Sequence, residues 1–137
     1  MKNANLSFKG QIPFNEEFGD IYFNTDKPWL ESEFVFASAL DEIWQSKDSF
    51  IVAETGFGAG LNFFTLCKKF KNSPKKLHFV SIEKSPIKKE YFLKIYENLG
   101  IFKAYAKKLV SLYPPLISGI HRINFAPNIT IDLCYGE

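Results

Sequence analysis

Apolar residues recur along the chain with two different periods, and these periods separate helices from strands. Between residues 29 and 44 they return every three or four positions, which is the spacing of one helix face, and Pro28 suits a first helical turn. The same spacing predicts further helices at residues 61–70, 87–99 and 101–112.

Strands are predicted where short apolar or alternating runs lie between turn residues. Residues 50–53 form a continuous apolar run, the pattern of a strand covered on both faces, and residues 77–83 form a second strand. Residues 121–125 and 129–135, on either side of a Pro-Asn turn, predict a strand pair, and residues 18–23 predict a short strand or extended arm. Alternating strands and helices followed by a strand pair predict an α/β sheet.

The composition fits one domain, or a piece of one, because 46% of the 137 residues are apolar and 17% are aromatic. The formal charge of +2 is too small to identify a partner. Cys67 and Cys134 lack zinc-site spacing, so we expect two buried thiols, no disulfide and no bound metal. We also expect a cytoplasmic protein, since neither a signal peptide nor a membrane-spanning stretch is evident.

The most informative motif follows the strand at residues 50–53. Residues 54–60 read Glu-Thr-Gly-Phe-Gly-Ala-Gly. Between a strand and a helix, glycines let the backbone approach a ligand closely, and the N–H groups of the helix start favour an anionic or polar group. The dinucleotide fingerprint would need glycine at Leu61 or Phe63, which disfavours NAD and FAD. No Lys-Ser/Thr pair follows the loop, which argues against ATP hydrolysis.

The loop pattern Glu-x-Gly-x-Gly-x-Gly resembles motif I of class I methyltransferases, in which the loop passes beneath the methionine part of S-adenosylmethionine. Glu83 ends the next predicted strand, where a carboxylate can accept hydrogen bonds from both ribose hydroxyls of an adenosine ligand. For a lone glycine loop a plain tight turn would be the favoured interpretation, whereas the acid in register favours the cofactor. Glu54 fits two roles, binding loop amides or lying near the amino-acid end of the cofactor.

Four segments in succession resemble the methyltransferase domain of the MnmC family, the bacterial bifunctional enzymes of 5-methylaminomethyl-2-thiouridine biosynthesis. The segments are FGDIYFNTDKPWLESEFVF, IVAETGFGAGLNFFTL, LHFVSIEKSPIKKE and IHRINFAPNITIDLCYGE. The resemblance implies a class I, Rossmann-like α/β methyltransferase fold, truncated after the first part of its sheet. Residues 1–48 would form an N-terminal extension and a helix packing on the domain, and residues 49–137 the part that binds S-adenosylmethionine.

The resemblance also implies a reaction and its partners. The family methylates the exocyclic amine of 5-aminomethyl-2-thiouridine at the tRNA wobble position, and FAD belongs to a fused oxidoreductase domain that this chain does not contain. The family's Asp-Gly-Phe-Ala-Pro segment, which lies by the reacting amine, is absent here, so no catalytic residue is predicted. The predicted cofactor-binding residues are Glu54, Gly56, Phe57, Gly58, Gly60, Asn62, Glu83, Lys84 and Glu137. The family usually has Asp where Glu137 stands.

Two other functions share these features: a class I methyltransferase with another acceptor, and an inactive fragment that binds the cofactor or tRNA without turnover. His78 and His121 have no carboxylate or thiol at ligand spacing, which favours structural roles. Lysines cluster after the glycine loop and around the second strand, where they would attract phosphates or simply solvate the surface. They are Lys68, Lys69, Lys71, Lys75, Lys76, Lys84, Lys88 and Lys89. The oligomeric state does not follow from the sequence.

Overall fold

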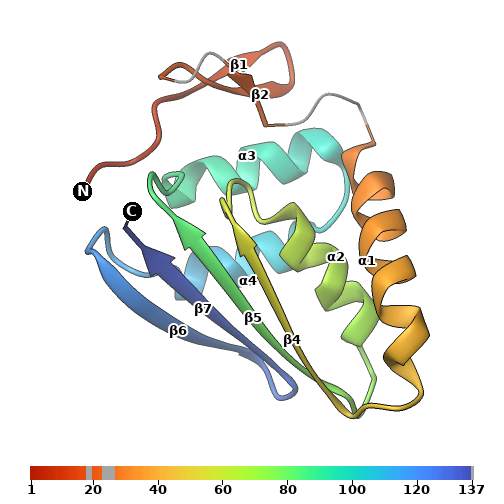
Figure 1. The fold of residues 1–137 in the computed structure, drawn as a ribbon. Coiled ribbons are helices and arrows are strands. Elements are labelled where there is room, and N and C mark those ends of the chain that lie inside the picture. The colour runs from red at the N-terminus through yellow and green to blue at the C-terminus, as the bar shows by residue number, and fades with distance from the viewer. Residues whose placement is uncertain (18–19, 23–26, 137) are drawn as a thin grey trace.

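The computed structural model describes residues 1–17, 20–22 and 27–136. Its main sheet has four strands in the order β4-β5-β7-β6, with β5 parallel to both β4 and β7, and β6 antiparallel to β7 (Figure 1). The strands are β4 (Ser49–Thr55), β5 (Lys76–Glu83), β6 (Gly119–Ala126) and β7 (Ile129–Tyr135). This arrangement confirms the predicted α/β sheet and its terminal strand pair.

Helices cover one face of this sheet, as Figure 1 shows for α2, α3 and α4 behind the strands. The helices are α1 (Pro28–Trp44), α2 (Leu61–Phe70), α3 (Lys89–Leu99) and α4 (Lys103–Leu112), and α1 packs beside α2. Phe63 and Phe64 of α2 are fully buried against Phe79 of β5 and Phe125 of β6, which makes the core strongly aromatic. None of the helices in the described part of the chain has the length and apolar character that a bilayer crossing requires.

All four predicted helices are present, and two of them begin two residues later than the periodicity indicates. Ile87 is 1% exposed, and its burial within the extended segment before α3 mimics a helical core position. Before α4, Phe102 has a φ of +61° in the left-handed region, so the regular helix starts only at Lys103. Buried apolar side chains next to a helix thus extend the apparent period.

The N-terminal residues form a separate small sheet above the carboxyl ends of the main strands (Figure 1). Its antiparallel strands are β1 (Leu6–Lys9), β2 (Ile12–Asn15) and β3 (Asp20–Ile21). The strand predicted at residues 18–23 therefore appears as β3, with its ends, residues 18–19 and 23, outside the described residues. The β1–β2 hairpin was not predicted, since four-residue strands give too short an alternating pattern.

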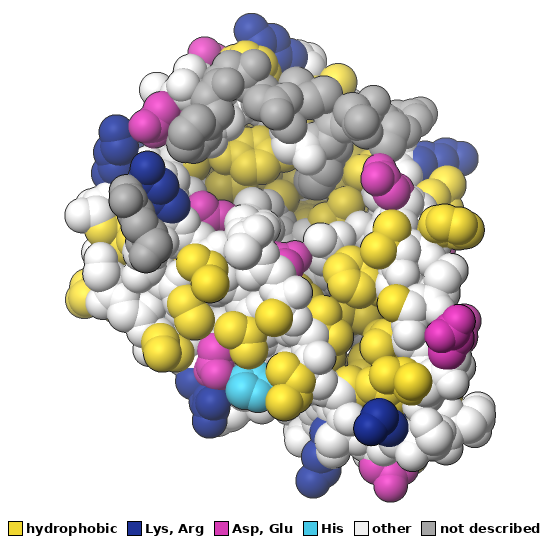
Figure 2. Space-filling model, viewed as in Figure 1, with side chains coloured by type: hydrophobic (Ala, Val, Ile, Leu, Met, Phe, Trp, Pro, Cys, Tyr) yellow, Lys and Arg dark blue, Asp and Glu magenta, His cyan; other side chains and the backbone are white. Residues whose placement is uncertain are grey.

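The opposite face of the main sheet has no covering helix among the described residues. Ile51 of β4 and Ile120 of β6 are 77% and 75% exposed there, and Figure 2 shows apolar side chains spread over this face. The expectation that residues 50–53 are covered on both faces is therefore wrong for this chain. Cys134 lies on the same face and is half-buried, whereas Cys67 is buried. The prediction of a buried thiol is therefore confirmed for Cys67 and wrong for Cys134. An apolar run reports a strand without showing which faces are covered.

A charged cluster interrupts this apolar face. Asp132 of β7 accepts two hydrogen bonds from the Arg122 guanidinium, at 2.8 and 2.9 Å, and lies 2.7 Å from Nε2 of His78. Principally because of the Arg122 hydrogen bonds, the pKa of Asp132 falls to about 2. His78 therefore has a carboxylate partner, although none lies near it in the sequence. The two side chains link β5 to β7 on the open face of the sheet.

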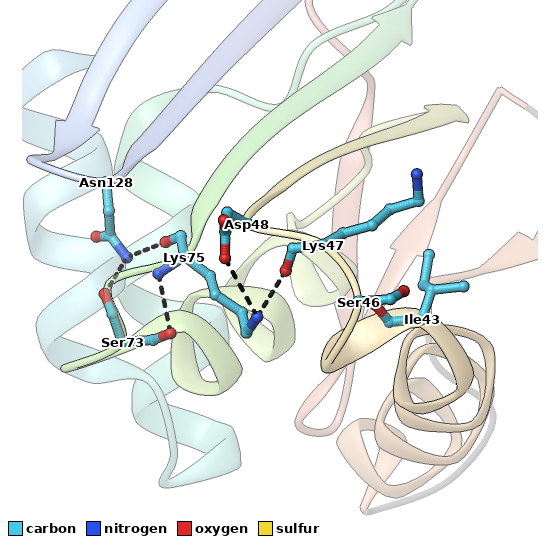
Figure 3. Close-up of polar contacts among 7 residues, drawn as sticks. All are labelled: Ile43, Ser46, Lys47, Asp48, Ser73, Lys75 and Asn128. Carbon is cyan, nitrogen blue, oxygen red and sulfur yellow. Dashed lines mark hydrogen bonds and ion pairs between the residues drawn. The ribbon is translucent and has the colours of Figure 1, made fainter.

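At the end of the sheet away from the carboxyl ends of β4 and β5, Asn128 lies in the turn between β6 and β7 (Figure 3). Its side-chain amide donates to the carbonyl oxygens of Phe70, Ser73 and Lys75 at 2.9–3.1 Å. The ammonium of Lys75 in turn donates to the Lys47 carbonyl oxygen at 2.6 Å. The two N–H groups of one amide are thus shared among three carbonyl oxygens, at the end of α2 and in the segment that joins it to β5.

We predict that Asn128→Ala lowers the free energy of unfolding by about 1–3 kcal/mol, because it leaves three carbonyl oxygens without this donor. Chemical denaturation followed by circular dichroism measures the change. Asn124→Ala, on the neighbouring strand and exposed, serves as the control and is expected to be nearly neutral. Equal effects of the two substitutions would show that the Asn128 hydrogen bonds do not stabilise the fold.

We also predict a loss of stability in acid that depends on Asp132. A carboxyl whose pKa is lowered by folding stabilises the protein above its unfolded pKa, and the benefit disappears as the pH falls through the folded pKa. Since the folded pKa is about 2, the advantage of the native chain over Asp132→Asn, roughly 1–2 kcal/mol, should be constant above pH ~5 and vanish between pH ~4 and ~2. Urea unfolding at several pH values tests this, and a pH-independent difference would contradict it.

Candidate functional site

A cavity of about 410 Å³ lies where β4 and β5 end and their loops begin. Parallel pairing in register, with Thr55 beside Ile82, brings the two carboxyl ends together. The walls of the cavity are formed by Asn15, Tyr22, Gly56, Phe57, Gly58, Ala59, Leu61, Asn62, Glu83, Lys84 and Ser85. The volume falls within the range of small-molecule sites, about 300–1,000 Å³. The glycine loop and the acid of the second strand therefore meet around one hollow.

Glu83 connects the two loops around the cavity. One carboxylate oxygen accepts a hydrogen bond from Gly58 N at 2.9 Å, and the other accepts from Ser85 N at 2.9 Å. Gly56 N donates to the Ile82 carbonyl oxygen at 2.7 Å, which holds the start of the loop against β5. A carboxylate has about four lone-pair sites, so Glu83 retains acceptor capacity for further hydroxyl groups.

The glycines of the loop adopt backbone conformations that other residues rarely take. Gly56, Gly58 and Gly60 have φ angles of +82°, +54° and +77°. At Gly60 a Cβ would lie 2.8 Å from the Phe57 ring. A residue with a side chain at this position would therefore force the loop out of its present conformation. At Gly56 a Cβ would meet nothing within 4 Å, so this glycine leaves cavity space that a side chain would enter.

Glu54 supports the loop from beneath rather than lining the cavity. Its carboxylate accepts hydrogen bonds from the Asn62 amide at 3.0 Å and the Ser81 hydroxyl at 2.8 Å, and the Asn62 oxygen accepts from Ser32 at 2.7 Å. Burial raises the pKa of Glu54, while the bonds from Asn62 and Ser81 oppose that shift. The carboxylate therefore accepts from side chains and fixes Asn62 in the wall of the cavity. Of the two roles predicted for Glu54, binding of loop amides is thus not the one observed.

The N-terminal sheet contributes a wall that sequence reasoning missed. The Tyr22 ring lies 3.5 Å from the position that a Cβ of Gly58 would occupy, and Asn15 Nδ2 lies 3.1 Å from the Tyr22 hydroxyl. Both residues line the cavity. They precede the glycine loop by more than thirty positions, and no local pattern reports a contact made by chain reversal. Tyr22 had only supported the family resemblance.

The structure brings most, but not all, of the predicted site residues to this cavity. Those that line it are Gly56, Phe57, Gly58, Asn62, Glu83 and Lys84. Glu54 and Gly60 lie behind this wall, bonded to Asn62 and packed on Phe57 respectively. Glu137 lies outside the described residues. Within the described part of the chain, no group of three or more His, Cys, Asp or Glu side chains is placed to hold a metal ion.

The wall of the cavity combines hydrogen-bonding groups with apolar surface. Glu83 supplies acceptors for a diol, Asn62 adds a polar side chain, and Gly56 leaves room for close approach. Phe57 and Leu61 provide apolar surface in the same wall. A small ligand that carries both hydroxyl groups and apolar surface fits this set of groups.

Known proteins are similar to this chain in sequence. MnmC, the tRNA 5-methylaminomethyl-2-thiouridine biosynthesis bifunctional protein, of Campylobacter concisus is 94% identical over 137 residues, which cover all of this chain and 22% of that protein. MnmC of Campylobacter hominis is 54% identical, over 96% of the chain, and MnmC of Actinobacillus pleuropneumoniae is 37% identical, over 98%. No family model matches the chain.

The fold has a solved counterpart. A crystal structure of MNMC2 from Aquifex aeolicus matches all of this chain and 44% of its own, with a TM-score of 0.65 and 16% sequence identity. The predicted α/β fold thus matches part of a known structure. The chain spans about a fifth of the length of the curated relatives it matches. Over its whole length it is a close relative of one segment of the MnmC proteins.

Proposed function

We propose that the cavity binds S-adenosylmethionine and that the chain forms the cofactor-binding part of a methyltransferase. The observation that carries this proposal is the Glu83 carboxylate, which lies against the glycine loop with acceptor capacity to spare. In this proposal Glu83 binds the ribose hydroxyls, and Gly56 and Gly58 approach the methionine part. Lys84 also lines the cavity and, in this proposal, lies on the adenine side of Glu83. Glu137 would lie near the same adenine ring.

When bound, the cofactor supplies an electrophilic methyl group on its sulfonium, and no covalent enzyme intermediate is needed. The contribution of this chain is positioning. Glu83 orients the ribose, the glycine loop fixes the amino-acid end, and Tyr22, which follows β3, packs against Gly58 of the loop. Rigid placement of this kind lowers the barrier of a transfer reaction without any nucleophilic side chain.

The substrate follows from the relatives in this proposal. MnmC proteins are named for biosynthesis of 5-methylaminomethyl-2-thiouridine in tRNA. Together with the family resemblance, this name supports the aminomethyl group of the wobble uridine as the acceptor. The loop of this chain lacks a dinucleotide fingerprint, which disfavours FAD here. In this proposal FAD belongs to another part of the bifunctional protein, as the family resemblance implies. The residue that receives the amine proton is not assigned to this chain.

Cofactor binding is tested with Gly56→Ala, in which the new Cβ enters the cavity. We expect the affinity for S-adenosylmethionine to fall by about tenfold or more, measured by calorimetric titration. Gly100→Ala is the matched control: Gly100 has a φ of +73° and an equally open Cβ position, so it imposes the same backbone strain away from the cavity. Unchanged affinity in Gly56→Ala, or an equal loss in both variants, would contradict the proposed site.

The acceptor is tested in a chimera in which this chain replaces the matching segment of Campylobacter concisus MnmC. We expect transfer of labelled methyl groups to tRNA that carries 5-aminomethyl-2-thiouridine, and none to fully modified tRNA. Gly56→Ala in the chimera should reduce the rate at limiting cofactor and leave the flavin reaction unchanged. Methylation of another acceptor would contradict the tRNA assignment while leaving the cofactor site intact.

A further inference from the structure

The N-terminal sheet is joined to the rest of the domain at two places. Ala4 N and Asn3 Nδ2 donate to the Pro86 carbonyl oxygen at 3.0 and 2.9 Å, which ties the first residues to the loop after β5. The Phe8 ring of β1 packs on the Tyr91 ring of α3, with 6.1 Å between the ring centroids. The small sheet therefore holds a defined position above the carboxyl ends of the main strands (Figure 1).

This sheet brings Tyr22 to the wall of the glycine-loop cavity. Tyr22 follows β3, and its backbone N–H donates to the Pro13 carbonyl oxygen of β2 at 3.0 Å. Its ring lies 3.5 Å from the position that a Cβ of Gly58 would occupy. Gly58 N in turn donates to the Glu83 carboxylate at 2.9 Å. Tyr22 and Glu83 thus lie beside the same glycine, and both line the cavity.

The Tyr22 hydroxyl has one of its hydrogen-bonding roles filled by Asn15. Asn15 Oδ1 accepts from Glu17 N at 3.0 Å, so the amide nitrogen is the end that faces Tyr22, and it donates to the phenol oxygen at 3.1 Å. Within the described part of the chain, Tyr22 makes no hydrogen bond through its own O–H hydrogen. That hydrogen can therefore be donated to a ligand.

The phenol keeps this hydrogen at neutral pH. Burial raises the pKa of Tyr22, the hydrogen bond from Asn15 opposes this shift, and the negative charge of Glu83 adds to it. The wall thus places a hydrogen-bond donor, Tyr22, near an acceptor, Glu83. A ligand hydroxyl group suits such a pair, because it donates one hydrogen bond and accepts others at the same time.

We propose that Tyr22 binds the ribose together with Glu83, so that one ribose hydroxyl donates to the carboxylate and accepts from the phenol. This role rests on the proposed function, since it requires the ribose to lie at Glu83. Asn15 is a positioning residue, because its amide fixes the direction of the phenol oxygen. The cofactor site then extends to the N-terminal sheet, which precedes the glycine loop by more than thirty positions.

The test is a thermodynamic cycle between protein and ligand, measured by calorimetric titration of the 137-residue chain. The ligands are S-adenosylhomocysteine and its 2′-deoxy and 3′-deoxy analogues. We expect Tyr22→Phe, which keeps the ring, to weaken binding of S-adenosylhomocysteine about three- to tenfold. The same substitution should leave the affinity for one of the deoxy analogues unchanged, because that analogue lacks the hydroxyl group that Tyr22 contacts.

Tyr91→Phe is the matched control, since Tyr91 packs on the same small sheet but lies outside the cavity. This variant should bind all three ligands as the native chain does. Equal weakening of all three ligands in Tyr22→Phe would show a packing role only and would overturn the inference. Unchanged affinity in Tyr22→Phe would also overturn it, and both results would leave the proposed cofactor site intact.

A different result separates this inference from the proposed function. If the native chain is folded by circular dichroism and does not bind S-adenosylhomocysteine, the cofactor site itself is contradicted, and the role of Tyr22 with it. If the native chain binds and Gly56→Ala weakens binding, the site is supported whatever Tyr22→Phe shows. The deoxy analogues then decide the role of Tyr22 alone.

Discussion

The site depends on the two hydrogen bonds that the Glu83 carboxylate accepts. It accepts one hydrogen bond from the glycine loop and one from the loop after its own strand, and so joins the ends of β4 and β5. This is possible only because α2 returns the chain to a parallel, in-register neighbour. The aromatic core around Phe63 and Phe79 holds that crossover in place. Core packing, sheet register and loop geometry are therefore all needed to hold the Glu83 carboxylate in this position.

Much of this arrangement could be predicted from the sequence. The helical spacing of residues 61–70 and the apolar run before the glycine loop report α2 and β4, because local periodicity reflects local burial. The pairing of the loop with Glu83 was also predictable, since both lie at carboxyl ends of neighbouring parallel strands. These features depend on short stretches of chain and on a connection of known handedness.

Other features depend on contacts between distant segments, which no local pattern reports. Tyr22 reaches Gly58 through the N-terminal sheet, and Asp132 meets His78 across 54 positions of sequence. The exposure of Ile51 was missed for a related reason, because an apolar strand reads the same whether one or both of its faces are covered. The position of Glu54 beneath the loop, bonded to Asn62 rather than to loop amides, likewise required the fold.

The central claim is that Glu83 binds the ribose of S-adenosylmethionine. A crystal structure of the chain with the product S-adenosylhomocysteine tests it most directly, because the product has the same ribose and amino-acid end. We expect both ribose hydroxyls to lie within hydrogen-bonding distance of the Glu83 carboxylate, with the homocysteine part along Gly56 and Gly58. A ribose placed anywhere else, with Glu83 still bonded only to the Gly58 and Ser85 amides, would contradict it.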